Sequence, residues 1–445
     1  MQNRLVILGG GESGIGAALL AKGKGYDVFV FDESSLKENY RNELLQAQIR
    51  FAEKSADEQL LLNADEVVKS PGIPDGNVWV KKIRANGISV ISEIELAYRY
   101  KGKSKIIAIT GSNGKSTTTA LTFHICRHAG LDCALVGNIG YSFARQVAQD
   151  PKQLYVAEIS SFQLDDIKNF RADVAVLLNI TEDHLDRYDY KFEHYIRSKF
   201  RIAMNQTSKD YFIYNMDDVV IMKNRSNYKL KSNQLPITMK QEVKPGAFIK
   251  DGEMHIIVGT EQVSMSIYDF ALKGKHNQYN TMAACVAGAT IEIRKNKIRE
   301  AVQTFRSLEH RMESVATVRG VEFINDSKAT NVNSTWFALE SMDKSTILIL
   351  GGIDKGNDYN LIKHLVSEKV KAIVCLGVDN HKIHEAFGDI KKVVDTSGAD
   401  EAVKAAFQLA TQGDAVLLSP ACASFDLFKN YEDRGVQFKK AVKNL

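Results

Sequence analysis

The chain has 445 residues, with 58 Lys and Arg against 54 Asp and Glu and a formal net charge of +4. At about 150 residues per domain, this length predicts about three domains. A charge so near zero excludes a general polyanion-binding surface, so nucleic acid is not an expected partner. No apolar run reaches the roughly 18 residues of a membrane span, and glycines with Glu12 follow the first apolar run too early for a signal peptide. We expect a soluble, cytoplasmic protein whose five scattered cysteines are core residues.

Short runs rich in β-branched residues alternate with helix-length segments, which is typical of parallel α/β domains. Strands are predicted over residues 5–8, 28–31, 106–109, 154–157, 174–180 and 347–350. A helix is predicted over 93–100, followed by a charged joint at 101–105. A second helix, from 297, should end near 305, before a strand-turn-strand around Arg319-Gly320. The two joints divide the chain into three α/β segments, predicted at 1–102, 103–305 and 306–445.

A glycine-rich loop, Gly9-Gly10-Gly11-Glu12-Ser13-Gly14, joins the first strand to a helix, and Asp32 ends the next strand. This context is typical of a dinucleotide-type site, in which a pyrophosphate meets a helix N-terminus and the carboxylate bonds a ribose or base. The alternative is a plain strand-turn-helix whose glycines serve tight packing. If the loop binds NAD, the protein is an oxidoreductase; if it binds another nucleotide diphosphate, the chemistry lies elsewhere in the chain.

A second loop, Thr110 to Thr117, follows the strand at 106–109 and precedes a helical segment. Its Gly-Lys-Ser-Thr ending indicates a phosphate loop, although Ile109 stands where the common pattern has its first glycine. Backbone N–H groups would surround the phosphates, Lys115 would face the β and γ oxygens, and Ser116 or Thr117 could ligate Mg²⁺. ATP is therefore the predicted ligand of Gly111, Ser112, Asn113, Gly114, Lys115, Ser116 and Thr117.

Two different nucleotide loops in one chain weaken the dehydrogenase interpretation and favour ATP-driven modification of a nucleotide-tagged substrate. Glu158 ends one predicted strand and His184 follows another, so both should lie near the phosphate loop at the carboxyl edge of the sheet. A carboxylate and a neutral imidazole suit a divalent ion there. Lys199, by residue type alone, is interpreted as a solvated lysine on the basic face of a helix.

Several motifs together resemble the Mur ligases, ATP-dependent amino-acid ligases that build the peptidoglycan stem peptide. The central motifs are 110–117, Gly137 to Gly140, Glu158 to Leu164, Asn179 to Asp186 and His276 to Asn280. The C-terminal motifs are His310-Arg311, Asp326 to Asn331, Gly351 to Lys355 and Leu418 to Asp426. These C-terminal motifs resemble the family member that adds D-glutamate to UDP-N-acetylmuramoyl-L-alanine. The resemblance implies a Rossmann-like N-terminal domain, a central ATP-binding domain with a mainly parallel sheet, and a Rossmann-like C-terminal α/β domain.

The resemblance also implies a role for individual residues. The UDP-sugar substrate is assigned Glu12, Ser13, Asp32, Glu33, Ser70, Pro71, Gly72, Asn138 and His184. Beyond the phosphate loop, ATP is assigned Asn277, Arg311 and Asp326, and D-glutamate is assigned Lys328, Thr330, Lys355, Ser424 and Tyr431. The implied catalytic residues are Lys115, Glu158, His184, Lys199 and Lys328. The implied metal ligands are Ser116, Glu158, His184 and Lys199 as a carbamate, which reverses the surface interpretation of Lys199.

The implied activity is ATP-dependent amide formation through an acyl phosphate and a tetrahedral intermediate, with two Mg²⁺ ions, in a monomer. One alternative is a ligase of the same superfamily for another amino acid or for folate, although a folylpolyglutamate synthase does not need the first domain. Another is a nucleotide-sensing protein without ligase activity, which need not keep Lys199, Lys328 and Lys355 together.

Overall fold

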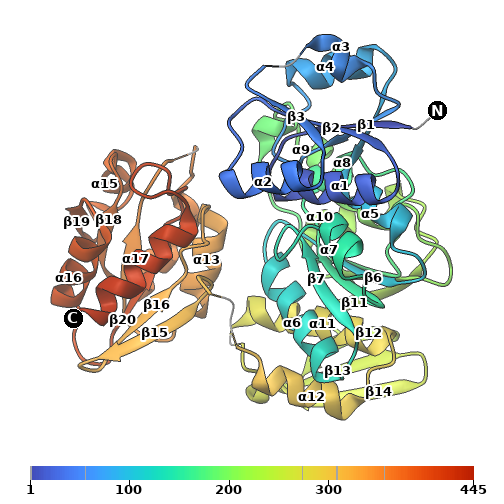
Figure 1. The fold of residues 1–445 in the computed structure, drawn as a ribbon. Coiled ribbons are helices and arrows are strands. Elements are labelled where there is room, and N and C mark those ends of the chain that lie inside the picture. The colour runs from blue at the N-terminus through green and yellow to red at the C-terminus, as the bar shows by residue number, and fades with distance from the viewer. Residues whose placement is uncertain (1–2, 56, 273, 307–308, 355) are drawn as a thin grey trace. The chain divides into compact units, whose positions relative to one another are not determined.

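The computed structural model describes residues 3–55, 57–272, 274–306, 309–354 and 356–445. Its strands form three sheets, within residues 4–92, 105–266 and 313–418 (Figure 1). Two compact units contain them: Met1–Phe270 with Tyr279–Phe305, and Ala271–Gln278 with Arg306–Leu445. The predicted class, α/β with mainly parallel sheets, is confirmed. The predicted domain limits at 102 and 305 stay a prediction.

The first sheet has five parallel strands in the order β3-β2-β1-β4-β5. Its strands are β1 (Arg4–Leu8), β2 (Asp27–Asp32), β3 (Arg50–Glu53), β4 (Glu66–Lys69) and β5 (Ser89–Ser92). Its helices are α1 (Glu12–Gly23), α2 (Glu38–Gln46), α3 (Glu58–Leu62), α4 (Val78–Ala85) and α5 (Glu93–Tyr100). Because β1 is central and fully paired, its carboxyl end places the glycine loop between the ends of β2 and β4.

The second sheet has nine strands in the order β14-β13-β12-β11-β10-β9-β6-β8-β7, with β6 between β9 and β8. The strands are β6 (Lys105–Thr110), β7 (Cys133–Gly137), β8 (Leu154–Glu158), β9 (Val174–Leu177), β10 (Tyr211–Asn215), β11 (Asn233–Thr238), β12 (Gly246–Lys250), β13 (Glu253–Val258) and β14 (Glu261–Ser266). Only the β12-β13-β14 edge is antiparallel. The helices are α6 (Lys115–His128), α7 (Phe143–Gln149), α8 (Ser161–Asp165), α9 (Phe192–Phe200), α10 (Val219–Asn224), α11 (Lys275–Thr290) and α12 (Lys295–Thr304).

The predicted strand over 174–180 is wrong at its end, because β9 stops at Leu177. The N–H of Leu178 still donates to Thr110 O at 3.0 Å, but Asn179 turns its backbone and side chain to the phosphate loop. Residues 178–180 therefore lie outside the regular strand, where Asn179 holds the phosphate loop.

The third sheet has the order β15-β16-β20-β17-β18-β19, and only the β15-β16 pair is antiparallel. Its strands are β15 (Glu313–Val318), β16 (Val321–Asn325), β17 (Thr346–Leu350), β18 (Val370–Leu376), β19 (Lys392–Thr396) and β20 (Ala415–Leu418). Its helices are α13 (Val332–Ser341), α14 (Asn360–Lys369), α15 (His381–Phe387), α16 (Ala399–Leu409) and α17 (Tyr431–Lys443). The hairpin confirms the predicted strand-turn-strand, and all five cysteines are buried, as expected.

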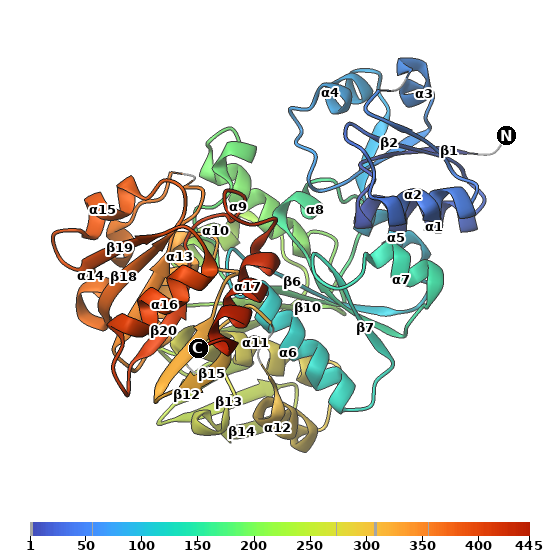
Figure 2. The same ribbon diagram turned by 60° about the vertical axis from the view of Figure 1, so that its left-hand side comes forward.

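Helices α1 and α7 lie side by side (Figure 2), which joins the first two sheets in one unit. Gly16 makes this approach possible, since a Cβ there would come within 1.8 Å of Ser142 Oγ. Beside it, the buried Glu93 of α5 accepts the N–H of Ala144, in the first turn of α7, at 2.5 Å. Burial raises the pKa of Glu93 to about 7, although the α7 N–H groups and Ser142 favour its charged form.

Replacing Glu93 with glutamine should flatten the pH dependence of stability between about pH 5 and 7. Because the pKa of Glu93 is higher in the folded state, its contribution is present below the unfolded value of 4.5 and is lost as pH rises through about 7. The difference corresponds to about 3 kcal/mol in the free energy of unfolding. Urea unfolding at pH 5 and pH 8 measures it, with the exposed Glu38→Gln as control; parallel pH profiles for wild type and Glu93→Gln would contradict the assignment.

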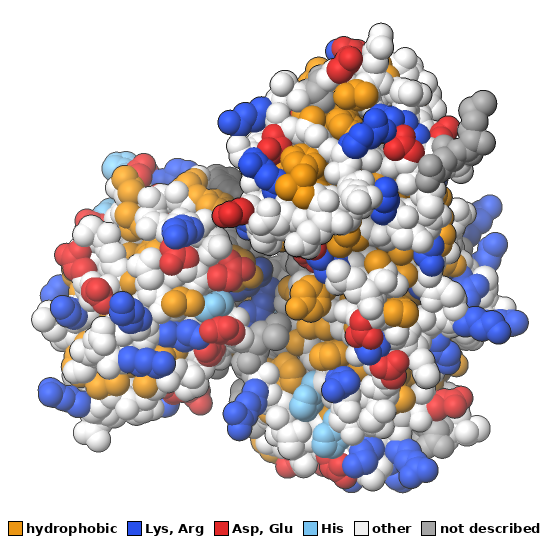
Figure 3. All heavy atoms as spheres, in the orientation of Figure 1, with side chains coloured by type: hydrophobic (Ala, Val, Ile, Leu, Met, Phe, Trp, Pro, Cys, Tyr) orange, Lys and Arg blue, Asp and Glu red, His pale blue; other side chains and the backbone are white. Residues whose placement is uncertain are grey.

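Acidic and basic side chains are interspersed over the face shown in Figure 3, in agreement with the near-neutral total. Among the described residues, no helix is long and apolar enough to cross a membrane.

Candidate active site

The phosphate loop lies between β6 and α6 and is held by Asn179. Asn179 Oδ1 accepts the N–H of Asn113 at 2.8 Å, its amide donates to Asn113 O at 3.0 Å, and its carbonyl accepts the N–H of Ser112 at 3.0 Å. Gly114 has a φ of +79° directly before α6, which glycine adopts without strain. A Cβ at Gly111 would meet Leu178 Cβ at 3.0 Å, so the loop also needs a glycine there. The predicted strand-loop-helix is confirmed.

Two lysines meet at one carbonyl of this loop. Gly111 O accepts from Lys115 Nζ at 2.7 Å and from Lys199 Nζ at 2.8 Å, and Lys199 also donates to Thr110 Oγ1 at 3.2 Å. Lys199, on α9, is 1% exposed, so its interpretation as a solvated lysine on a basic surface is wrong. Burial lowers the pKa of Lys199 well below its usual range, and the neighbouring Lys115 ammonium lowers it further. Lys199 is therefore a buried amine with a strong tendency to be neutral.

Glu158, the last residue of β8, is 1% exposed, and its carboxylate lies close enough to Lys199 to interact with that amine electrostatically. Its Oε1 accepts from Asn138 Nδ2 at 2.6 Å, whereas its Oε2 is buried without a hydrogen-bond partner among the described residues. Gly137 permits the close approach of β7, because a Cβ there would lie 2.3 Å from Glu158 O. A buried carboxylate oxygen without a donor is a suitable ligand for a divalent cation.

His184 lies in the loop after β9, immediately before the 3₁₀ turn η1 (Leu185–Arg187), with a φ of +54°. Its ring contacts Phe162 edge-on at 5.1 Å, and its Nε2 is 3.6 Å from the Asp183 carboxylate. Partial burial lowers the pKa of His184, and Lys115 and Lys199 lower it further, although Asp183 opposes them. The imidazole is therefore neutral near pH 7, the form that binds metals and accepts protons.

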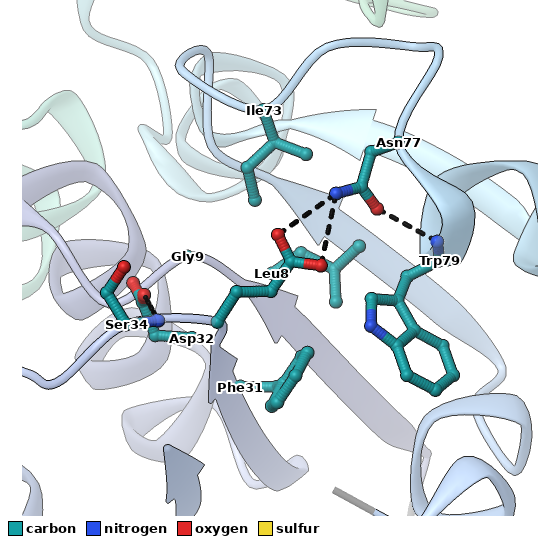
Figure 4. Close-up of a pocket in the computed structure, with 9 residues that line it drawn as sticks. Leu8, Gly9, Phe31, Asp32, Ser34, Ile73, Asn77 and Trp79 are labelled. Carbon is teal, nitrogen blue, oxygen red and sulfur yellow. Dashed lines mark hydrogen bonds between the residues drawn. The ribbon is translucent and has the colours of Figure 1, made fainter. Parts of the chain in front are cut away.

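The glycine loop of the first sheet borders a cavity of about 200 Å³ (Figure 4). Asp32 accepts the N–H of Gly10 at 2.7 Å and that of Ser34 at 2.8 Å, and Asn77 donates to the Glu33 carboxylate at 3.1 Å. Asn77 and Trp79 were not singled out from the sequence, because neither belongs to a recognisable motif. The lining residues are Leu8, Gly9, Phe31, Asp32, Glu33, Ser34, Ile73, Asn77 and Trp79.

Glu12, assigned to the pyrophosphate by the resemblance, instead turns its side chain to α7. Its carboxylate accepts from Arg145 Nε at 2.8 Å and from the N–H of Ser142 at 3.2 Å. Arg145 also pairs with Glu43, so it offsets part of the negative charge of Glu12. The backbone N–H groups that begin α1 are the candidate phosphate donors of this loop.

Arg187 is a site residue that sequence reasoning missed. Its guanidinium lies 4.2 Å from the centre of the Phe162 ring and donates to three carbonyls in the loop after β4: Pro71 O at 3.2 Å, Gly72 O at 3.3 Å and Ile73 O at 3.2 Å. The side chain thus fixes the predicted substrate loop against the loop that carries His184. Its position three residues after His184 was the available signal, but the partner loop is far away in the sequence.

Replacing Arg187 with alanine should raise the KM for the predicted UDP-sugar substrate about tenfold, or ~1.4 kcal/mol, because the loop at 71–73 loses its three hydrogen bonds to the guanidinium. Arg187→Lys should recover little, since an ammonium cannot reproduce the planar fork. Initial rates measure both, with the exposed Arg197→Ala as control. An unchanged KM in Arg187→Ala would contradict a role for Arg187 in positioning the loop at 71–73.

In the second unit, Asp326 is buried at the end of β16. Its two oxygens accept from Ser419 Oγ at 2.9 Å and from the N–H of Met312 at 3.2 Å. Burial raises the pKa of Asp326 to about 7, opposed by Ser419 and by the Arg311 guanidinium. Arg311 and Asp326 are therefore neighbours, as their shared assignment to ATP requires.

Lys328 lies with its Nζ 3.7 Å from the centre of the Tyr431 ring, and the carbonyl of Tyr431 accepts from Ser327 Oγ at 2.8 Å. Ser424 is buried and Thr330 is exposed. Asn277 follows His276, whose ring stacks on Phe337 at 4.0 Å. The remaining predicted D-glutamate residue, Lys355, lies outside the described residues.

The structure thus gathers Lys115, Glu158, Asn138, His184 and Lys199 around the phosphate loop in the first unit, and it gathers Arg311, Asp326, Lys328 and Tyr431 in the second. A parallel sheet with a phosphate loop at its carboxyl edge, a buried carboxylate and a neutral histidine defines an α/β nucleotide-binding enzyme of the phosphate-loop class.

Comparison with known proteins identifies the family within that class. Residues 3–92 match the family model "Mur ligase MurD-like, N-terminal domain", residues 109–288 match "Mur ligase middle domain", and residues 310–422 match "Mur ligase, glutamate ligase domain". The chain is 50% identical over 446 residues to a UDP-N-acetylmuramoylalanine--D-glutamate ligase of Christiangramia forsetii, covering 100% of both. It is 51% identical to the protein of that name in Bacteroides fragilis, covering 99% of this chain and 100% of the relative. The chain belongs to the Mur ligase family.

A solved structure supports the fold independently. The UDP-N-acetylmuramate-alanine ligase MurC of Thermotoga maritima aligns over 99% of both chains with a TM-score of 0.63, at 16% sequence identity.

Proposed function

We infer that this chain is an ATP-dependent ligase that joins D-glutamate to UDP-N-acetylmuramoyl-L-alanine in peptidoglycan precursor synthesis. The observation that carries this inference is the 50% identity, over the full length of both chains, to relatives named for that reaction. The phosphate loop with its buried carboxylate and lysine supplies the machinery such a reaction needs.

The first domain, proposed as 1–102, would bind the UDP end of the substrate. The cavity at the carboxyl edge of β1 and β2 would offer Asp32 and Glu33 to the nucleoside. The N–H groups of Gly11, Glu12 and Ser13, at the start of α1, would bind the pyrophosphate. The loop Ser70-Pro71-Gly72, fixed by Arg187, would follow the substrate toward Asn138 and His184, where the alanyl carboxylate would lie.

The residues around the phosphate loop fit Mg²⁺. The buried Glu158 Oε2 is an oxygen ligand and the neutral His184 is a nitrogen ligand. Ser116 adds a hydroxyl in the first turn of α6, next to Lys115. These residues would hold Mg²⁺, which would supply positive charge to offset the negative charge of the phosphates. We propose two ions, as the family resemblance implies.

Lys199 would complete the metal site as a carbamate. Carbon dioxide reacts with a neutral amine, and the lowered pKa of Lys199 provides that form. Forming the N–C bond converts the neutral amine into a carbamate anion and releases one proton to solvent. The anion would attract the Lys115 ammonium, whereas a protonated Lys199 would repel it, because both amines lie at Gly111 O.

A carboxylate is a poor acyl donor, because its leaving group would be oxide. In the proposed reaction an oxygen of the alanyl carboxylate attacks the γ-phosphorus of ATP, and ADP leaves. The resulting acyl phosphate has phosphate as its leaving group. The neutral amine of D-glutamate then attacks the acyl carbon to form a tetrahedral oxyanion, which collapses to the amide with loss of phosphate. When it does not ligate Mg²⁺, the neutral His184 can accept the proton of the attacking amine.

Because ATP, the alanyl carboxylate and glutamate are all anions, positioning and charge neutralisation should dominate catalysis. We assign Arg311 and Asp326 to ATP, together with Asn277 at the start of α11. Lys328 would lie where ATP and the amino acid meet. D-Glutamate would be held by Lys328, Thr330, Lys355, Ser424 and Tyr431, the last through its backbone.

Phosphate release with ATP, UDP-N-acetylmuramoyl-L-alanine and a panel of amino acids tests the substrate. We expect release with D-glutamate and none with L-glutamate, L-lysine or diaminopimelate. Release only with another amino acid would make the chain a sibling ligase, and binding of both nucleotides without release would make it a nucleotide sensor.

We further propose that the protein is cytoplasmic and monomeric. A dimeric mass in light scattering would contradict the monomer.

A further inference from the structure

Three metal-ligating side chains lie together in the second unit, outside the residues assigned to the reaction. Cys375 Sγ, a ring nitrogen of His384 and a carboxylate oxygen of Asp395 lie within 4.8 Å of one another. His384 Nε2 is 3.0 Å from Asp395 Oδ1 and 2.9 Å from Oδ2. A thiol, an imidazole and a carboxylate are the donor types that zinc combines in proteins.

The fold builds this cluster from rigid parts. Cys375 on β18 and Asp395 on β19 are direct partners in the parallel register, so their side chains leave the same face of the sheet. His384 comes from α15, in the connection between these two strands. Asn380 Nδ2 donates to Asp395 Oδ1 at 3.0 Å and orients the carboxylate, as outer hydrogen bonds orient ligands at metal sites.

Burial differs among the three in a way that suits a metal. Cys375 is fully buried, whereas the side chains of His384 and Asp395 are 42% and 58% exposed. A cation from solvent can therefore reach His384 and Asp395 directly, and the sulfur lies within 4.8 Å of both. The second cluster of this kind among the described residues, Glu309 with His310 and Glu313, already has the Lys439 ammonium on its two carboxylates.

We propose that Cys375, His384 and Asp395 form a binding site for a zinc-type divalent transition metal, with water as the fourth ligand. On binding, the S–H bond breaks, the proton goes to solvent, and a sulfur–metal bond forms; no redox change is involved. The soft thiolate donor disfavours the hard ion Mg²⁺.

Through α15, the metal site would affect the segment that carries a predicted D-glutamate residue. Lys382, on the same helix, has its Nζ 2.9 Å from Asp354 Oδ1, in the segment between β17 and α14 that also contains the predicted D-glutamate residue Lys355. A metal that fixes α15 would fix this ion pair. The binding test below does not depend on the proposed ligase activity.

Cobalt(II) is the probe, added to the full-length protein with excess Mg²⁺ to occupy the proposed catalytic site. We expect a near-ultraviolet thiolate-to-cobalt charge-transfer band, which Zn²⁺ abolishes by displacement. Cys375→Ser should lose the band, and His384→Ala and Asp395→Asn should weaken cobalt affinity at least ~10-fold. His381→Ala, on the same helix outside the cluster, should behave as wild type.

Two results would overturn the proposal: no charge-transfer band in the wild type, or a band of equal affinity in the His384→Ala and Asp395→Asn variants. Both of these side chains are partly exposed, so the variants should fold even if Cys375→Ser does not. A rise in melting temperature with Zn²⁺ in the wild type, absent from His384→Ala, is the second readout.

Discussion

Lys115→Ala should lower ATP turnover by about 10³-fold while leaving the affinity for the UDP-sugar substrate nearly unchanged. The Lys115 ammonium is fixed by two carbonyls of the phosphate loop, Gly111 O and Ser112 O, each at 2.7 Å. It is therefore poised over the loop where the β and γ phosphates of ATP would lie. Its loss removes a charge that matters most as negative charge is redistributed in phosphoryl transfer, whereas the proposed uridine cavity is built by other residues.

Single-turnover phosphate release and calorimetric titration of the UDP-sugar measure these two effects separately. Lys103→Ala, an exposed lysine just before β6, is the matched control and should retain wild-type turnover. Normal turnover in Lys115→Ala would remove the phosphate-loop assignment. A parallel loss of UDP-sugar affinity would mean that the two nucleotide sites are not separate.

Lys199→Ala should reduce kcat by at least ~10²-fold, and short carboxylic acids such as acetate or formate should restore part of it. The variant removes the side chain whose carbamate would hold the metal beside Glu158. A small carboxylate can enter the space left by the buried side chain and supply the missing anionic oxygens. The neutral amine favoured by burial next to Lys115 is the physical reason to expect a carbamate at this lysine.

Lys191→Ala, the exposed residue before α9, is the control for this variant and should be neither impaired nor stimulated by added acids. Mass spectrometry of the native wild type should detect the mass of one added carbon dioxide, absent from Lys199→Ala. Loss of activity without rescue, together with an unmodified Lys199, would contradict the carbamate and leave Lys199 with only its hydrogen bonds to Gly111 O and Thr110 Oγ1.

The sequence predicted those strands, helix starts and turns that depend on interactions between residues close together in the chain. Buried strands have apolar β-branched runs, the helix after Gly114 begins where a glycine permits a φ of +79°, and the hairpin at Arg319-Gly320 has a turn signal. The end of β9 was predicted too late, because Leu178 and Ile180 are as apolar as a strand residue. What ends the strand is the side chain of Asn179, which bonds a loop 66 residues away.

Site residues that belong to a sequence motif could be predicted. Site residues that only the fold brings together could not. Residue type alone put Lys199 on the surface, since neither its burial nor its shared carbonyl with Lys115 can be read from the sequence around it. Arg187 donates to a carbonyl 114 residues away in the sequence, and Glu12 accepts from an arginine 133 residues away. Cys375 and Asp395 become neighbours only through strand register.

The most direct test of the central claim follows a heavy oxygen isotope from the alanyl carboxylate of UDP-N-acetylmuramoyl-L-alanine during turnover with ATP and D-glutamate. We predict one amide product containing D-glutamate per ADP formed, and one isotope label in each released phosphate, because the carboxylate oxygen leaves with the acyl phosphate. Unlabelled phosphate, or phosphate release without the D-glutamyl amide, would contradict the proposed ligase reaction.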